Sequence, residues 1–212
     1  MSAPRPQHIE TRADIDAGTN WLIAAEPRFA KAIEATGPLP LRRRAGGFSQ
    51  LLAAIVSQQL SVASADAIWA RLQEAGLTEA AVLLGADENR LRACGLSRQK
   101  ITYARALAGS GIDYGALAAL PDEEVIARLV AVKGIGRWSA EIYAMFSLGR
   151  ADVFAAGDLA LQEAVRLLFA LQSRPREAAL RKTALAWSPW RAIAARALWA
   201  YYRHVKQREG IR

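Results

Sequence analysis

The strongest constraint on the fold is a helical period in the apolar residues along most of the chain. Strand-like alternation is scarce, and residues 152–154 are at most a buried connector. Because helices average about 11–12 residues, the sequence predicts an all-α fold of roughly nine to eleven helices. The clearest pattern follows the glycine pair at 46–47 and predicts two helices, with apolar positions Phe48, Leu51, Leu52, Ile55, Val56, Leu60, Ile68, Trp69 and Leu72.

Proline, glycine and capping residues indicate where the later helices begin and end. Proline favours the first turn of a helix, and glycine favours the position after the last turn. Acidic residues favour the first turn, and serine favours the N-cap. These signals predict five helices. The first follows Pro121 and ends at Gly134, and the second runs from about Arg137 to before Gly149. The third follows Asp158, the fourth follows Pro175, and the last extends from an N-cap at Ser188 to about Arg203.

The charge balance favours a polyanionic partner. The 212 residues include 28 basic and 20 acidic side chains, which give a formal net charge of +8. Nucleic acid is the first candidate, since arginine predominates and its planar guanidinium suits phosphate oxygens. Arginine used simply as a surface helix residue is the alternative. The run Arg42-Arg43-Arg44 is either a phosphate-contacting edge or a solvated linker.

Composition excludes several classes of site and partner. The single cysteine, Cys94, cannot form an internal disulfide or a four-thiolate metal site. His8 and His204 lie far apart without a carboxylate-rich motif, so no metal site is predicted. The longest apolar run, 51–56, is far shorter than the ~18 residues of a membrane span. The polar segment 1–12 lacks the apolar centre of a secretory signal, so we expect a cytoplasmic protein without a membrane partner.

An alternating Gly134-Ile135-Gly136 sequence separates two of the predicted helices, with Lys133 and Arg137 on either side. Glycines there permit a tight turn with positive φ and a close backbone approach. The amides of such a turn form a positive site that can hold a phosphate without contacting any base. Taken alone, the segment is also compatible with an ordinary helical hairpin.

Longer motifs around this turn carry a family resemblance. They are 132–143 (VKGIGRWSAEIY) and 152–162 (DVFAAGDLALQ), supported by 55–63 (IVSQQLSVA), 95–100 (GLSRQK) and 187–191 (WSPWR). These motifs resemble the helix-hairpin-helix DNA glycosylase superfamily, most closely its DNA-3-methyladenine glycosylase II branch. The resemblance covers about 48–202. It implies two helical lobes with an active-site cleft between them, 48–150 and 1–47 plus 151–212.

The resemblance implies that Asp158 is the catalytic carboxylate. Cleavage of an N-glycosidic bond leaves positive charge on the sugar, which an oriented carboxylate stabilises. Taken alone, Asp158 is typical of an N-cap, and it can fill both roles. Asp152 is the nearby competitor, and its other possible role is to cap a helix or to pair with Arg150 or Arg137.

An aromatic pocket for the flipped-out base is also implied, with Trp138, Trp190 and Tyr143 as its members. Relatives carry the pocket tyrosine one position earlier, where this chain has Ile142. An aromatic face attracts the cationic ring of an alkylated purine. A core role is the alternative for these tryptophans, as it is the expected role of Trp69, Trp187 and Trp199.

The resemblance implies contacts to DNA from two segments. Leu60, after Gln59, matches the family's apolar wedge, which fills the gap left by a flipped nucleotide. A core leucine on a helical face is the alternative. The other predicted DNA contacts are Gln59, Lys133, Gly134, Ile135, Gly136 and Arg137.

The implied activity is hydrolytic excision of alkylated purines, of the 3-methyladenine and 7-methylguanine type, from double-stranded DNA. Some relatives carry a lysine nucleophile where this chain has Trp138, so no lyase step is expected. The resemblance implies no catalytic cofactor. It does imply a structural monovalent cation bound to the hairpin carbonyls. A monomer associated with the nucleoid is expected. A non-catalytic module that binds damaged DNA and a glycosylase for oxidised or mismatched bases stay open as alternatives.

Overall fold

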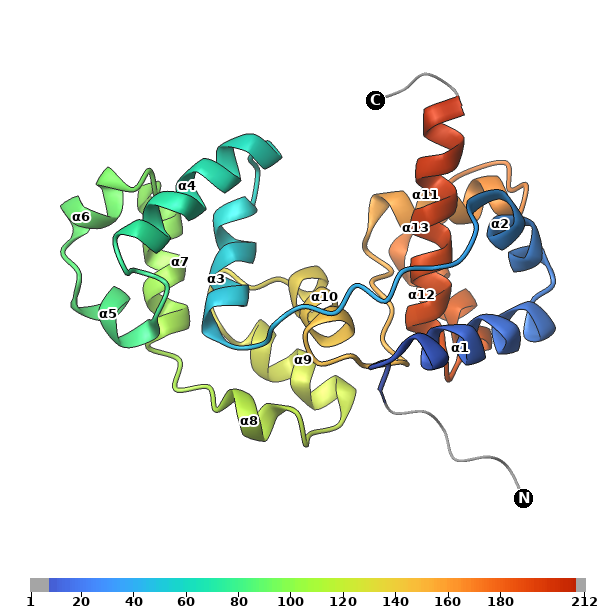
Figure 1. The fold of residues 1–212 in the computed structure, drawn as a ribbon, viewed down its shortest axis with the longest axis horizontal. Coiled ribbons are helices and arrows are strands. Elements are labelled where there is room, and N and C mark those ends of the chain that lie inside the picture. Colours follow the sequence, from blue (N-terminus) through green and yellow to red (C-terminus); the bar gives the residue numbers. More distant parts are fainter. Residues whose placement is uncertain (1–7, 209–212) are drawn as a thin grey trace. The chain divides into compact units, whose positions relative to one another are not determined.

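The computed structural model describes residues 8–208, and every regular element in them is a helix (Figure 1). This range contains thirteen α-helices, one 3₁₀ helix and an isolated bridge between His8 and Arg150. The predicted all-α fold is therefore confirmed. The predicted number of helices is wrong, because α5, α6 and α8 have only 6, 6 and 4 residues, too few to show a helical period.

The helices form two compact units. The hairpin unit comprises residues 44–143, and the Asp158 unit comprises 8–43 and 144–208. The division falls inside α10, after Tyr143, whereas the lobes predicted from the sequence divide at Arg150. In chain order the elements are α1 (Arg12–Ala25), α2 (Arg28–Thr36), α3 (Phe48–Ser57), α4 (Val62–Glu74), α5 (Ala80–Gly85), α6 (Glu88–Ala93), α7 (Arg98–Ala108), α8 (Tyr114–Leu117), α9 (Asp122–Val130), α10 (Arg137–Phe146), α11 (Leu159–Leu168), α12 (Glu177–Thr183), η1 (Ala184–Trp187) and α13 (Arg191–Arg208).

The core of the Asp158 unit forms around α13, which packs against α1, α2 and α11. Buried alanines along α13 allow these helices to approach closely. Next to it, Trp187 of η1 is 1% exposed, and its ring lies 5.3, 5.4 and 6.0 Å from those of Phe29, Phe154 and Phe169. The core position predicted for Trp187 is confirmed.

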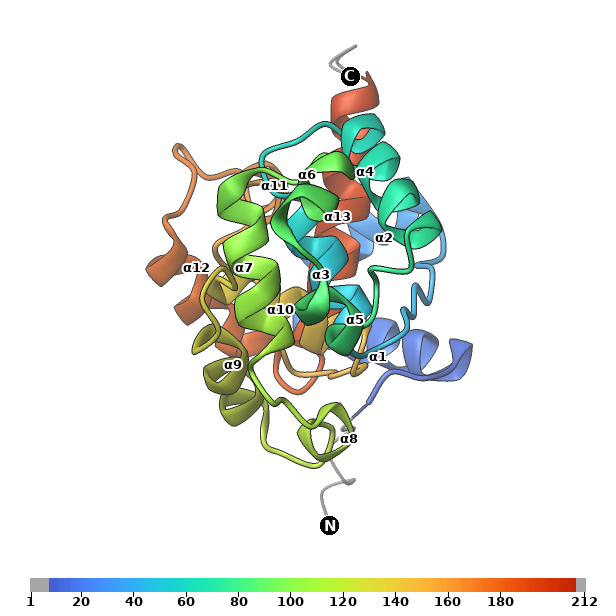
Figure 2. The same cartoon turned by 90° about the vertical axis from the view of Figure 1, so that its left-hand side faces the viewer.

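The centre of the hairpin unit is the pair α3 and α7, with α4 packed on α3 and with α5 and α6 packed on α7 (Figure 2). The Lys100 ammonium on α7 donates to the Val56 carbonyl near the end of α3 at 2.5 Å. Burial lowers the pKa of Lys100. This contact satisfies a carbonyl that a helix end leaves open, and it fixes the place where the chain leaves α3.

Some helix ends differ from the predictions. α3 ends before Leu60, and α9 ends before Gly134. α13 begins at Arg191 rather than directly after Ser188. The Ser188 hydroxyl does not cap that helix, because it donates to Asp152 at 2.7 Å. No helix among residues 8–208 has both the length and the apolarity that crossing a bilayer requires.

We predict that Trp187→Ala destabilises the protein by about 3–5 kcal/mol, because it removes a fully buried ring from an aromatic cluster. The matched control is Leu185→Ala in the same 3₁₀ helix, where the side chain is 61% exposed. Its cost should stay within about 0.5 kcal/mol. Urea unfolding followed by far-ultraviolet circular dichroism measures the stability of both variants. Equal losses of stability would contradict the assignment of Trp187 to the core.

Candidate active site

The turn between α9 and α10 exposes backbone amides, and buried side chains anchor it to the hairpin unit. Val132 and Ile135 are buried in it, and the Ile135 amide donates to the Val132 carbonyl at 3.0 Å. Gly134 has a φ of +99°, and a Cβ there would overlap the ring of Tyr103, whereas a Cβ at Gly136 would meet open space. Within the described residues, the amides of Gly134 and Gly136 donate to no protein group. They are therefore available to an anion.

The segment between α3 and α4 is tied to this turn. The Gln58 side-chain amide donates to the Gly134 carbonyl at 3.0 Å. Gln59 has a φ of +57°, which is uncommon for a residue other than glycine. Leu60 follows it and is 40% exposed, outside any helix. The structure thus brings the segment of the predicted wedge next to the predicted phosphate site, and it does not place Leu60 in the core.

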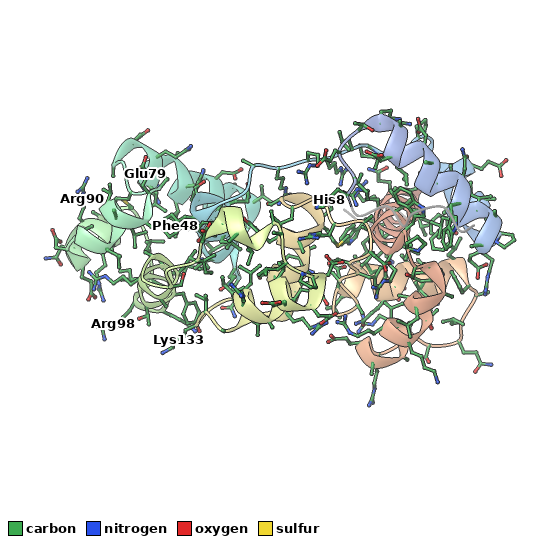
Figure 3. All side chains as sticks on the ribbon, turned by 90° about the horizontal axis from the view of Figure 1, so that it is seen from below. His8, Phe48, Glu79, Arg90, Arg98 and Lys133 are labelled. Atoms are coloured by element: carbon green, nitrogen blue, oxygen red, sulfur yellow. The ribbon has the colours of Figure 1, made fainter. Side chains whose placement is uncertain are left out.

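The two basic residues beside the turn have different surroundings. Lys133 is exposed, and Figure 3 shows it at the surface of the hairpin unit. Arg137 forms ion pairs of 3.0 Å with both Glu123 and Glu141. Glu141 is only 1% exposed, so Arg137 compensates a buried carboxylate in addition to lying beside the turn.

Asp158 is the N-cap of α11, in agreement with its position before an apolar helix. Its Oδ1 atom accepts the backbone N–H groups of Ala160 and Leu161 at 2.9 and 3.0 Å. The same atom accepts the indole N–H of Trp199 at 3.2 Å. Three donors on one oxygen hold the carboxylate in a single orientation. The side chain is partly exposed, which leaves it accessible to a substrate.

Trp199 is the candidate functional residue that the sequence pattern misses. Its helical spacing predicts a core position, but the side chain is only partly buried, and its partner lies 41 positions earlier in the chain. Its ring lies 5.8 Å from that of Phe146. No local signal in a single sequence connects Trp199 with Asp158, so the pair becomes visible only in the fold.

The predicted pocket residues differ in accessibility. Trp138, at the start of α10, is 47% exposed. Tyr143 is buried, its hydroxyl accepts the Gly47 amide at 2.8 Å, and burial raises the pKa of this phenol. Trp190 is also buried, with its ring against Gly18 of α1. Of these three residues, Trp138 alone has a largely exposed ring, and base contacts by all three stay predictions.

Asp152 is held in a different set of contacts from Asp158. It accepts the Ser188 hydroxyl at 2.7 Å and pairs with the Arg191 guanidinium at 2.7 Å. The predicted pairing with Arg150 or Arg137 is therefore wrong. These contacts tie the segment before α11 to the start of α13, which is a structural role.

A comparison with protein families gives a match that spans both the hairpin turn and Asp158. The family described as "HhH-GPD superfamily base excision DNA repair protein" matches residues 52–189, a range that includes the turn and Asp158. The chain belongs to the HhH-GPD superfamily.

Individual relatives of this HhH-GPD protein point to the alkylation branch. DNA-3-methyladenine glycosylase 1 from Schizosaccharomyces pombe is 33% identical over 162 residues, which cover 72% of this chain and 71% of the relative. A solved structure of the 3-methyladenine DNA glycosylase of that yeast in complex with abasic DNA aligns with a TM-score of 0.74 at 29% identity, covering 86% of this chain and 95% of that one. The structure of DNA-3-methyladenine glycosidase from Bacillus halodurans aligns with a TM-score of 0.76 at 31% identity, and the alignment covers 93% of this chain and 91% of that one. The resemblance predicted from the sequence is confirmed.

We expect the two glycines of the HhH-GPD hairpin to respond differently to alanine. Gly134→Ala should lower the free energy of unfolding by about 2–4 kcal/mol, because alanine there combines an unfavourable positive φ with overlap on the ring of Tyr103. Gly136→Ala should cost less than about 1 kcal/mol, since its Cβ meets open space. Urea unfolding, with hydrogen exchange of the α9 and α10 amides, measures both. Similar losses for the two variants would contradict the geometry described for the turn.

Proposed function

We propose that this protein is a monofunctional DNA glycosylase that removes alkylated purines from duplex DNA as a monomer. The observation that carries the proposal is the Asp158 carboxylate, partly exposed and held by three N–H donors, in a member of a base excision repair superfamily. The relatives supply the substrate class, since those from S. pombe and B. halodurans are named for 3-methyladenine. Purines of the 3-methyladenine and 7-methylguanine type are therefore the proposed substrates.

The proposed chemistry uses the fixed charge of Asp158. As the bond between base and sugar breaks, positive charge develops on the anomeric carbon and ring oxygen of the deoxyribose. A carboxylate already oriented toward that charge stabilises the transition state without reorganising, an effect worth about 3 kcal/mol or more. A purine alkylated at N3 or N7 is cationic in the nucleotide and leaves as a neutral base, so its departure needs no proton donor. Water then adds to the anomeric carbon and loses one proton to the solvent, which gives the abasic sugar.

Most of the proposed base and backbone contacts are assigned to the hairpin unit. The exposed indole of Trp138 stacks on the flipped cationic base, an attraction of about 0.5–2 kcal/mol. Leu60 fills the gap in the duplex, and the amides of Gly134 and Gly136, with Lys133, hold a phosphate. Because Trp138 stands where some relatives carry a lysine nucleophile, no covalent step precedes hydrolysis. Tyr143 and Trp190 are retained as further proposed members of the pocket.

The resemblance also implies a structural monovalent cation on the hairpin carbonyls. Carbonyl oxygen is a suitable ligand for a hard cation. The carbonyls of Val132 and Gly134 each accept one N–H, which leaves the second lone pair of each oxygen for an ion. These two residues would hold the cation, and its charge would strengthen phosphate binding. Among residues 8–208, no group of three or more His, Cys, Asp or Glu side chains is placed to hold a metal.

Asp158→Asn should slow release of 3-methyladenine from methylated duplex at least ~100-fold, because the negative charge is lost. Asparagine is an equally good N-cap, so the fold should persist. The control is Asp113→Asn, since Asp113 caps α8 through two amides at 2.9 Å and has no proposed role. Base release is measured in single-turnover assays by alkaline strand cleavage.

Three outcomes of that assay would overturn the proposal. Equal rates for wild type and Asp158→Asn would remove the catalytic role of the carboxylate. Duplex binding without base release by the wild type would favour a non-catalytic module. Release of oxidised or mismatched bases, with alkylated bases retained, would change the substrate class.

Trp199→Phe should lower the single-turnover rate about tenfold, because it removes one N–H donor to a charged acceptor. Duplex affinity should change by less than about twofold. Trp69→Phe, at another partly buried tryptophan on α4, is the matched control and should keep the wild-type rate. If the two variants behave alike, the hydrogen bond does not position Asp158.

A further inference from the structure

Four arginines of the Asp158 unit lie close together. Arg42 and Arg43 belong to the segment that leads from α2 to α3 (Figure 1), and Arg196 and Arg203 lie about two turns apart on α13. Burial, with the charges of Arg43 and Arg42, lowers the pKa of Arg196 to about 10. Burial and the charge of Arg42 also lower the pKa of Arg203. We call these four residues the arginine cluster.

Part of the arginine cluster completes the end of α10. A guanidinium nitrogen of Arg43 donates to the Phe146 carbonyl at 3.3 Å, and one of Arg196 donates to the Met145 carbonyl at 3.4 Å. Both carbonyls lie in the last turn of the helix. A helix C-terminus carries about half an elementary negative charge. Capping α10 therefore compensates only a fraction of the four positive charges.

Acidic side chains do not compensate the remaining positive charge of the arginine cluster. In the part of the chain that the structure describes, no aspartate or glutamate pairs with a member of the arginine cluster. Arg196 is 4% exposed, and within 8–208 its Nε atom has no hydrogen-bond acceptor. Arg42 and Arg203 are exposed. Arg42 also has a φ of +49°, which is uncommon for arginine. The cluster thus combines accessible guanidinium groups with an excess of positive charge.

We propose that the arginine cluster binds a phosphodiester of the DNA backbone, as a phosphate contact separate from the hairpin turn. The inference rests on the proposed function in one respect, that duplex DNA is the partner. Guanidinium groups bind phosphate oxygens through paired N–H donors. Arg42 and Arg203 contact the phosphate from the surface, and Arg196 contributes charge from beneath it.

The test compares Arg42→Gln/Arg203→Gln with a charge-matched control, Lys31→Gln/Arg176→Gln, in which both changed side chains are exposed and lie elsewhere in the same unit. Fluorescence anisotropy measures binding to an unmodified duplex between 50 and 200 mM potassium chloride. We expect the cluster variant to lose about tenfold in affinity and about one unit in the slope of log K against log salt. The control should keep the wild-type slope. Thermal unfolding verifies that both variants remain folded.

Other results would overturn the proposal. Equal changes in the two variants would indicate a general effect of net charge, and unchanged binding by both would remove the contact. Inorganic phosphate is added at constant ionic strength in a second arm. If it stabilises the wild type but not the cluster variant while the DNA slopes stay equal, the site takes free phosphate instead. Base release by the wild type is assayed separately, so loss of the glycosylase proposal and loss of the phosphate contact are distinguishable.

Discussion

The proposed chemistry depends on the hydrogen bonds that converge on Oδ1 of Asp158. Two of them come from the backbone amides that begin α11, so the contacts that start the helix also fix the carboxylate. The indole of Trp199 supplies the third from α13. A helix N-terminus favours negative charge, so the Asp158 carboxylate stabilises the fold at the place where the proposed reaction uses it. Local stability and the proposed reactivity therefore share one set of contacts.

Recognition of the DNA backbone has a different physical basis from recognition of the base. Turn amides and guanidinium groups bind phosphate without regard to sequence, which suits a repair protein whose target can lie next to any base. Under the proposed function, selection comes from the damaged base, through its positive charge, its weakened bond to the sugar and its proposed stacking on Trp138. The arginine cluster would give the Asp158 unit a backbone contact of its own, so that both units contribute to binding.

Much of this molecule could be predicted from its sequence, because its helices are amphipathic and its hairpin and Asp158 motifs are local. The missed features depend on long-range neighbours. The spacing of Trp199 suggested a core residue, yet its partner is 41 positions away. Ser188 looked like an N-cap, but its hydroxyl is engaged by Asp152. Arg42 and Arg43 form a visible charge run in the sequence, but only the fold shows that Arg43 and Arg196 donate to neighbouring carbonyls at the end of α10. Short helices such as α8 carry too few residues for any period.

Analysis of the products that the wild-type protein forms from methylated duplex DNA tests the central claim most directly. Chromatography of the released material should show free 3-methyladenine and 7-methylguanine. The DNA strand should remain intact until alkali is added, because in the proposed mechanism water and not a protein amine attacks the sugar. Absence of free base, or strand cleavage before alkali, would contradict a monofunctional glycosylase that acts through a fixed carboxylate.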